Sequence, residues 1–260
     1  MNTARVTVRD SGSLLAFEST GSEHTKVWDR FLTVEGKPAY HIGNVCGTCS
    51  FFFERLDGAN QSISPSEISD SLRQGLKDLD DSLLGKIKVI LPEGEYIASL
   101  LEVVPDRVLP GSGNDYFAHE QVELWGIDGF WNLPHYTKTE YYRSRSRNLG
   151  GRRKLFEFVI PMFPRNWLKA DEVDAYRTGI ASGQKPTALA LSVLDVKQPA
   201  TWNGEPAVTE HWCLAHYLLD GHHKMFAASA IDKPITLLSF LSLSESVATE
   251  ENISKLIDNL

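Results

Sequence analysis

A short apolar run that leads into a glycine and two histidines is the stretch of this sequence best suited to chemistry. Residues 217–219 are predicted to form a buried strand, and residues 225–230 to begin a helix. The first N–H groups of a helix have no partner within it and carry the positive end of its dipole, so the turn between strand and helix can bind an anion. The residues of that turn are Asp220, Gly221, His222, His223 and Lys224.

The turn also carries a family resemblance. Asp-Gly-His-His-Lys at 220–224, followed by Ala227 and Ala228, resembles the DGHHR-type signature of the ParB/sulfiredoxin superfamily. Residues 173–187 are similar to the helix, glycine, proline and strand of that family, and residues 231–238 resemble its closing strand. The resemblance covers about residues 160–240 and implies an α/β domain with a nucleotide-phosphate site at the turn.

The same resemblance implies an activity. Some members of the superfamily, including free serine kinases, transfer phosphate from ATP or ADP to a small molecule, and Mg²⁺ would bridge the nucleotide phosphates. The family usually has arginine where this chain has Lys224, which supplies a point charge without the arginine fork. The resemblance would also place a catalytic glutamate before the first helix, but residues 161–167 contain no carboxylate and are flanked by Glu157 and Glu172.

Three side chains are the candidate catalytic groups. His222 and His223 could hydrogen-bond phosphate oxygens, or one of them could move a proton, because imidazole titrates near neutral pH. Glu157 is a candidate carboxylate at the mouth of the site, and the alternative is an outward-facing strand residue.

Cys46 and Cys49 form the second motif with possible chemistry. Two thiols at this spacing, in a turn before a predicted helix, suit a redox dithiol or half of a zinc site, or are simply two buried small residues. A zinc site would need further ligands from elsewhere in the chain. The candidates for those ligands are His41, His211, Cys213 and His216.

A basic and aromatic stretch precedes the ParB-like region. Residues 143–154 contain six cations: Arg143, Arg145, Arg147, Arg152, Arg153 and Lys154. This cluster could be solvated surface, a loop that closes over a polyphosphate or anionic substrate, or a nucleic-acid contact beside Tyr141 and Tyr142. The aromatic residues at 125–142 suit core or lid packing, or a wall against a purine.

Composition narrows the class of protein. The chain has 260 residues, 42% of them hydrophobic and 23% charged, with 26 Lys and Arg against 34 Asp and Glu for a net charge of −8. An acidic balance disfavours a protein that coats nucleic acid. No window approaches the length of a membrane span, and the N-terminus lacks a signal-peptide pattern, so we expect a cytoplasmic protein without a membrane partner.

The predicted fold class is α+β. We expect an N-terminal α+β region at 1–110, an aromatic and basic connecting segment or lid at 111–154, and a ParB/sulfiredoxin-like α/β domain at 155–260. A helix is predicted at 65–79, with Ser64 as N-cap and Pro65 at its first position. Strands are predicted at 87–91 and 96–104, and a short helix at 250–260.

Three functions follow as hypotheses. The first is an ATP- or ADP-dependent phosphotransferase with a small-molecule acceptor. The second is a non-enzymatic module that binds a nucleotide or a partner and holds structural zinc at Cys46 and Cys49. The third is a thiol redox protein that uses the same two cysteines. A homodimer is compatible with each hypothesis.

Overall fold

The computed structural model describes residues 3–22, 25–61, 63, 66–130, 133–144, 146–201 and 204–260, with the backbone alone at 21, 22 and 25–28. In this part of the chain, nine strands form a large mixed sheet in the order β1-β6-β13-β11-β12-β10-β8-β7, and β9 also pairs with β10. The strands are β1 Thr3–Val8, β6 Gly94–Val103, β7 Asp106–Val108, β8 Tyr141–Arg143, β9 Arg147–Gly150, β10 Arg153–Pro161, β11 Thr187–Lys197, β12 Glu210–Asp220 and β13 Ile235–Ser242.

A smaller antiparallel sheet lies against the large one and has the order β2-β3-β4-β5. Its strands are β2 Leu15–Ser22, β3 Thr25–Val34, β4 Lys37–Asn44 and β5 Glu54–Arg55. In the large sheet, β10 pairs in parallel with β12, and β11 in parallel with β13, whereas β11 and β12 are antiparallel. Helices and two sheets together confirm the predicted α+β class.

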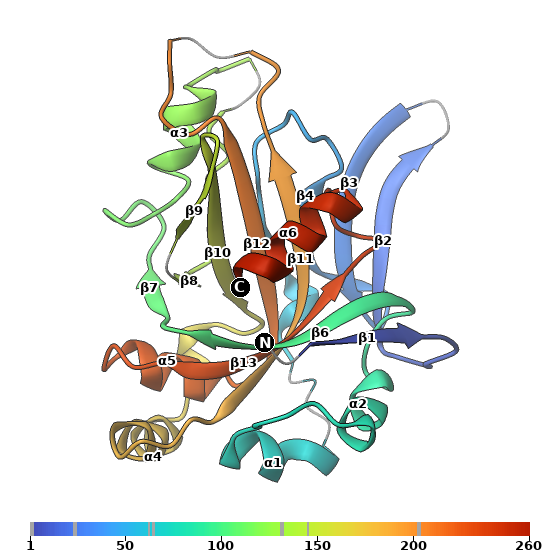
Figure 1. Ribbon diagram of the computed structural model, residues 1–260, viewed down its shortest axis with the longest axis vertical. Helices are drawn as coiled ribbons and strands as arrows, with labels where there is room; N and C mark the ends of the chain where they lie inside the picture. The colour runs from blue at the N-terminus through green and yellow to red at the C-terminus, as the bar shows by residue number, and fades with distance from the viewer. Residues whose placement is uncertain are drawn as a thin grey trace.

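The helices lie on both faces of the large sheet, and α6 crosses in front of β11 and β12 in Figure 1. The α-helices are α1 Ser69–Gln74, α2 Asp81–Lys88, α3 Glu120–Trp125, α4 Ala170–Ala181, α5 His222–Ser229 and α6 Glu250–Asn259. Short 3₁₀ turns lie at η1 Asp57–Ala59, η2 Ser66–Ile68 and η3 Arg165–Trp167. Among the described residues, no helix is both long and apolar enough to cross a lipid bilayer.

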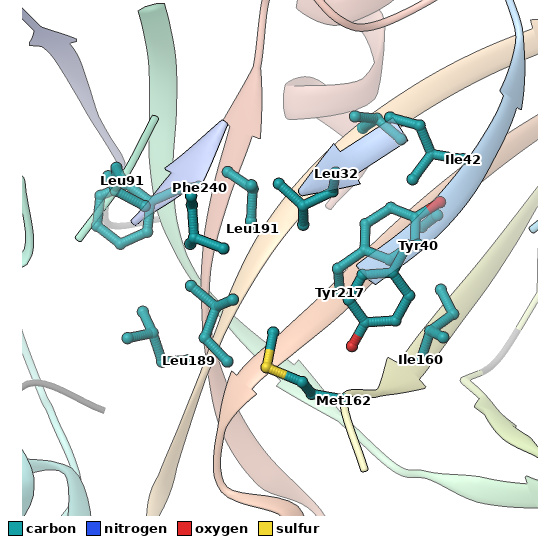
Figure 2. Packing of buried hydrophobic residues seen from close by; sticks show 14 of the residues in the cluster. Leu32, Tyr40, Ile42, Leu91, Ile160, Met162, Leu189, Leu191, Tyr217 and Phe240 are labelled. Atoms are coloured by element: carbon teal, nitrogen blue, oxygen red, sulfur yellow. The ribbon is translucent and has the colours of Figure 1, made fainter. Parts of the chain in front are cut away.

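The main hydrophobic core lies between the two sheets. Figure 2 shows Leu32 and Tyr40 of the small sheet facing Leu191 and Tyr217 of the large sheet. The rings of Tyr40 and Tyr217 lie 4.9 Å apart between centroids. Because each strand turns alternate side chains to opposite faces, β12 also buries a second set of residues against the helices.

That second face carries two separate apolar clusters. One packs α4 and α5 against the sheet and includes Met225 and Leu218, and the other packs α6 against it and includes Leu256 and Trp212. The α4–α5 cluster therefore supports the end of β12 from which the candidate turn departs.

The expected segments 1–110, 111–154 and 155–260 do not have separate cores. β1 and β6 of the first segment and β7 and β8, which span the second, belong to the same sheet as the strands of the third. The main cluster likewise contains Val6, Phe117 and Leu189, one residue from each segment.

Several local predictions need correction. The predicted strand at 87–91 is wrong, because Ile87 is a buried residue of α2. The predicted helix at 65–79 is represented by η2 and the shorter α1, which ends before Gly75 at a φ of 96°. Ser64 and Pro65, the expected cap and first residue, lie outside the described residues. The helix expected after Cys49 is absent among residues 50–56, where Phe51 and Phe53 enter the core as extended chain.

Candidate functional site

The predicted strand-to-helix junction exists, but the turn is shorter than the expected 220–224, because His222, His223 and Lys224 already form the first turn of the helix. β12 ends at Asp220, α5 begins at His222, and Gly221 between them adopts a left-handed conformation with φ 99° and ψ 20°. A Cβ at Gly221 would lie 2.6 Å from the Cβ of Ala188 on β11. Glycine is therefore required twice, by its backbone angles and by the close approach of the neighbouring strand.

The ammonium group of Lys224 is buried and hydrogen-bonded to other groups of the protein. Its Nζ donates to the Asp220 carboxylate at 2.8 Å and to the Thr187 carbonyl at 2.9 Å, and 4% of the residue is exposed. Burial lowers the pKa of Lys224, and the charge of Asp220 opposes that effect. The predicted phosphate ligands Asp220 and Lys224 thus neutralise each other.

His222 is a buried hydrogen-bond acceptor. Its Nε2 accepts the N–H of Met162 at 2.9 Å, which leaves the ring proton on Nδ1, and its ring stacks on Phe163 with centroids 3.8 Å apart. Burial lowers the pKa of His222 to about 3, and the nearby His223 and Lys224 add to the shift. At neutral pH the ring is uncharged and its lone pair is already used.

His223 makes a similar contact closer to the surface. Its Nε2 accepts the N–H of Lys169 at 3.1 Å, and its Nδ1 lies 3.5 Å from the Glu172 carboxylate. Burial lowers the pKa of His223, and Glu172 opposes the shift. Both histidines therefore attach α5 to the segment between β10 and α4.

A cavity of about 170 Å³ lies beside His222, and we call it the three-cation cavity after Arg55, Lys138 and Arg165 in its lining. Within the described residues, none of these three cations forms an ion pair, while the lining carboxylate Glu140 is bound by Arg107. The remaining lining residues are Thr139, Tyr142, Pro161, Phe163, Pro164, Leu168 and His222.

A second cavity of about 140 Å³ lies on the other side of the turn, at the N-terminus of α5. It has two cations, Arg73 and Lys224, and two carboxylates, Glu172 and Asp220. Because these charges balance and Lys224 is paired with Asp220, this cavity attracts an anion less than the three-cation cavity does.

Glu157 does not lie at the turn. It sits near the middle of β10, where its carboxylate is 3.2 Å from Nε2 of His216, four positions before Asp220 on β12. His216 Nδ1 is 2.7 Å from Ser192 Oγ, which is 2.9 Å from Ser239 Oγ. These groups form a buried polar row across four strands of the sheet, so the expected role of Glu157 at the mouth of the site has no support in its position.

Most of the described cations of the basic cluster lie toward the other end of β10 and its neighbours: Arg147, Arg152, Arg153 and Lys154. In the parallel pairing of β10 with β12, Arg153 is opposite Glu210, whereas Pro161 is opposite Leu218 near the turn. Arg143 pairs with Glu120, and Arg152 pairs with Glu205. Arg143 lies opposite Phe158 on β10, nearer the turn than the others, and Arg145 lies outside the described residues.

Cys46 and Cys49 are joined by a disulfide, with their Cα atoms 5.3 Å apart. Zinc ligation by two thiolates requires the reduced pair. The other proposed ligands point to different places: Cys213 contacts Tyr116 on one face of β12, and His216 binds Ser192 on the other face. Among the described residues, no group of three or more His, Cys, Asp or Glu could hold a metal ion.

Sequence reasoning singled out His222 and Tyr142 in the lining of the three-cation cavity but none of its three cations. Arg55 comes from β5, Lys138 from the segment before β8, and Arg165 from η3. No local spacing relates these positions. The one available signal was Arg165, which lies in the segment where a catalytic carboxylate was sought.

Comparisons with known proteins add no identification. The chain matches no family model, and neither the curated proteins nor the solved structures contain a match to it. The ParB/sulfiredoxin resemblance stays a prediction.

Proposed function

We propose that this protein binds a phosphorylated small molecule of the nucleotide class at the three-cation cavity. The observation that carries the proposal is that Arg55, Lys138 and Arg165 line one cavity and form no ion pair with a carboxylate of the described residues. Charge-assisted hydrogen bonds from arginine to phosphate are shorter and stronger than neutral ones, and the guanidinium fork matches two phosphate oxygens. Arg55 also donates to the Asn60 side chain at 2.7 Å, and the Arg165 guanidinium lies 5.1 Å from the centroid of the Phe226 ring. Neither contact neutralises a positive charge, so the cavity favours an anion.

The apolar part of the lining suits a ring beside the phosphate. Tyr142 and Phe163 contribute aromatic surface, and Phe163 is held in place by its stack on His222. A ligand with a phosphate group and a flat base would use both kinds of surface. His222 then acts as a support for the cavity wall.

The contacts of the turn favour binding without turnover. The lone pairs of His222 and His223 accept backbone N–H groups, so neither ring is free to act as a general base. Lys224 is held by Asp220, and Glu157 is distant from the turn. Of the functions expected from the sequence, the nucleotide-binding module therefore fits better than the phosphotransferase, and Mg²⁺ would arrive with the nucleotide phosphates.

Calorimetric titration of the full chain with ATP, ADP, CTP and inorganic phosphate, each with and without Mg²⁺, tests the proposal. Arg165→Ala is expected to weaken nucleotide binding about tenfold or more, because a hydrogen bond to a charged group contributes about 1.5–3 kcal/mol. Lys185→Ala removes a surface cation that pairs with Glu102 outside the cavity, and it should bind as the wild type does.

Two results would contradict the proposal. One is the absence of heat or thermal stabilisation with every nucleotide, since a ligand of the folded state must raise the unfolding midpoint. The other is equal weakening by Arg165→Ala and Lys185→Ala. Sustained release of phosphate from ATP would contradict the second part, binding without turnover.

A further inference from the structure

The loop that contains Cys46 and Cys49 is held in place at four points that do not involve the disulfide. The Asn44 side chain accepts the N–H of Cys46 at 3.0 Å, and the Gln198 N–H donates to the Gly47 carbonyl at 2.9 Å. The Lys197 ammonium donates to the Cys46 carbonyl at 2.9 Å, and the Trp125 indole N–H donates to the Thr48 carbonyl at 3.1 Å. The two cysteines therefore stay close together whether or not their sulfurs are bonded.

Lys197 is itself fixed from within the protein. It is 1% exposed, and its Nζ lies 3.5 Å from the carboxylate of Asp195, the next inward-facing residue on β11. The same ammonium binds the carbonyl of Asn44 at 2.9 Å. The cysteine loop thus rests on a buried ionic group, which gives it a rigid base.

A bond between Cys46 and Cys49 adds little to the fold. A disulfide stabilises mainly by restricting the unfolded chain, and the restriction grows with the number of residues enclosed. These cysteines are three positions apart and link no separate elements. The pair therefore contributes less stability than a disulfide that closes a long loop, and reactivity is the other use of two thiols at this spacing.

The two sulfurs have different surroundings. Cys46 Sγ accepts the N–H of Cys49 at 3.1 Å and lies 3.3 Å from the Thr48 hydroxyl. Donors of this kind stabilise a thiolate. Both cysteines are half-buried, and their neighbours Val45 and Thr48 are exposed, so a reagent can reach the pair from solvent.

We propose that Cys46 and Cys49 form a redox-active dithiol that exchanges with cysteine disulfides, a function separate from the nucleotide site. In the reduced protein, the Cys46 thiolate attacks one sulfur of a disulfide R–S–S–R, forms a mixed disulfide and releases one thiolate RS⁻. Cys49, as its thiolate, then attacks Cys46 Sγ, closes the Cys46–Cys49 bond and releases the second RS⁻. The protein dithiol is oxidised by two electrons and the substrate disulfide is reduced to two thiols, and excess thiol reverses both steps.

Trapping of the mixed disulfide tests the order of attack. Reduced, desalted full-length protein is mixed with glutathione disulfide, quenched with acid and analysed by intact mass and peptide mapping. The wild type should recover the Cys46–Cys49 bond, and Cys49→Ser should accumulate glutathione on Cys46. Cys46→Ser should form its adduct at least about tenfold more slowly, because within the described part of the chain the donors contact Cys46 Sγ and none contacts Cys49 Sγ.

Cys213 provides the internal control. It is fully buried, and burial raises the pKa of its thiol, so it should stay unmodified in the folded protein. Equilibration of the wild type in glutathione buffers gives a second measurement that does not depend on a variant, and we expect reversible opening and closing of the bond with unchanged circular dichroism.

Three outcomes would overturn the proposal. They are equal adduct rates for Cys46→Ser and Cys49→Ser, a bond that glutathione leaves intact in the folded protein, and stoichiometric zinc bound to the reduced pair. Nucleotide titration of the oxidised and the reduced protein measures binding at the three-cation cavity separately. Failure of the redox proposal can then be told apart from failure of the proposed nucleotide function.

Discussion

The histidines of the turn show how the surroundings of a single residue decide its chemistry. An imidazole in a polar turn suggests a donor to phosphate or a proton carrier. In the folded chain, His222 instead accepts the N–H of Met162 and stacks on Phe163, so it connects two segments as a neutral ring.

The low pKa of His222 predicts a dependence of stability on pH. Its pKa falls from 6.5 to about 3 on folding, chiefly because of burial, so between these values the unfolded chain binds a proton that the folded chain does not. The contribution of this pKa shift to the free energy of unfolding is fully present above pH 6.5. It decreases as the pH falls toward 3, by up to about 1.4 kcal/mol per pH unit.

Urea unfolding of the wild type and His222→Gln at about pH 7 and about pH 5 measures this effect. Glutamine keeps an acceptor for the Met162 N–H but does not titrate, so the variant should lose less stability between the two pH values. Buried His211, whose pKa also falls to about 3, leaves a residual slope in both proteins. Identical slopes would show that His222 is accessible to protons in the folded state.

At the scale of elements, the junction of β12 and α5 depends on Gly221. Alanine there would have to adopt φ 99° and place its Cβ 2.6 Å from the Ala188 Cβ. We expect Gly221→Ala to lower the free energy of unfolding by roughly 2–6 kcal/mol, the sum of about 1–3 kcal/mol of backbone strain and about 1–3 kcal/mol of overpacking.

Gly183 provides a matched control for that variant. It has the same φ of 99°, but a Cβ there would meet nothing within 4 Å. Gly183→Ala should therefore lower the free energy of unfolding only by the cost of backbone strain, about 1–3 kcal/mol. Equal losses in urea denaturation would mean that the contact with Ala188 relaxes without cost.

The two sheets are also connected by a buried ionic cluster. Arg30 on β3 donates to the Asp195 carboxylate on β11 at 2.6 Å, and Lys197 lies 3.5 Å from the same carboxylate. Arg30 and Asp195 expose 3% and 0% of their side chains. Burial alone would lower the pKa of Arg30, but its contacts with Asp195 outweigh that effect and raise it.

Asp195→Ala should lower the free energy of unfolding by about 3–5 kcal/mol, because it leaves two cations buried without their carboxylate. Asp174→Ala, which removes a solvent-exposed partner of Arg177, is the control and should change stability far less. Chemical denaturation of both variants makes the comparison. The Glu245 carbonyl already accepts a hydrogen bond from Arg30. A small effect of Asp195→Ala would therefore show that water or Glu245 replaces the lost partner.

At the scale of the whole molecule, the shared core predicts one cooperative unfolding transition. The main cluster joins Val6 and Leu32 to Leu189 and Phe240, so the N-terminal strands cannot separate without exposing the centre of the large sheet. Thermal unfolding followed by circular dichroism and by tryptophan fluorescence should give coincident midpoints. Two separated transitions would restore the expected boundary near residue 110.

Patterns local to the chain could be predicted. The apolar run before Asp220, the glycine after it and the alanines beyond it correctly indicated strand, turn and helix, because these depend on near neighbours. The strand predicted at 96–104 and the helix at 250–260 correspond to β6 and α6 for the same reason. The predicted strand at 87–91 was wrong, because an apolar run of that length fits a helix end equally well.

The sequence by itself determined the fold class, the junction at Gly221 and the closeness of Cys46 and Cys49, since these depend on backbone preferences and short spacing. Only the tertiary structure decided which of these groups can bind a ligand or take part in a reaction. It directed His222 and Lys224 into the protein, placed Glu157 with His216, and brought Arg55, Lys138 and Arg165 to one cavity. The physical reason is that burial and pairing are set by contacts between residues distant in sequence, which no local pattern records.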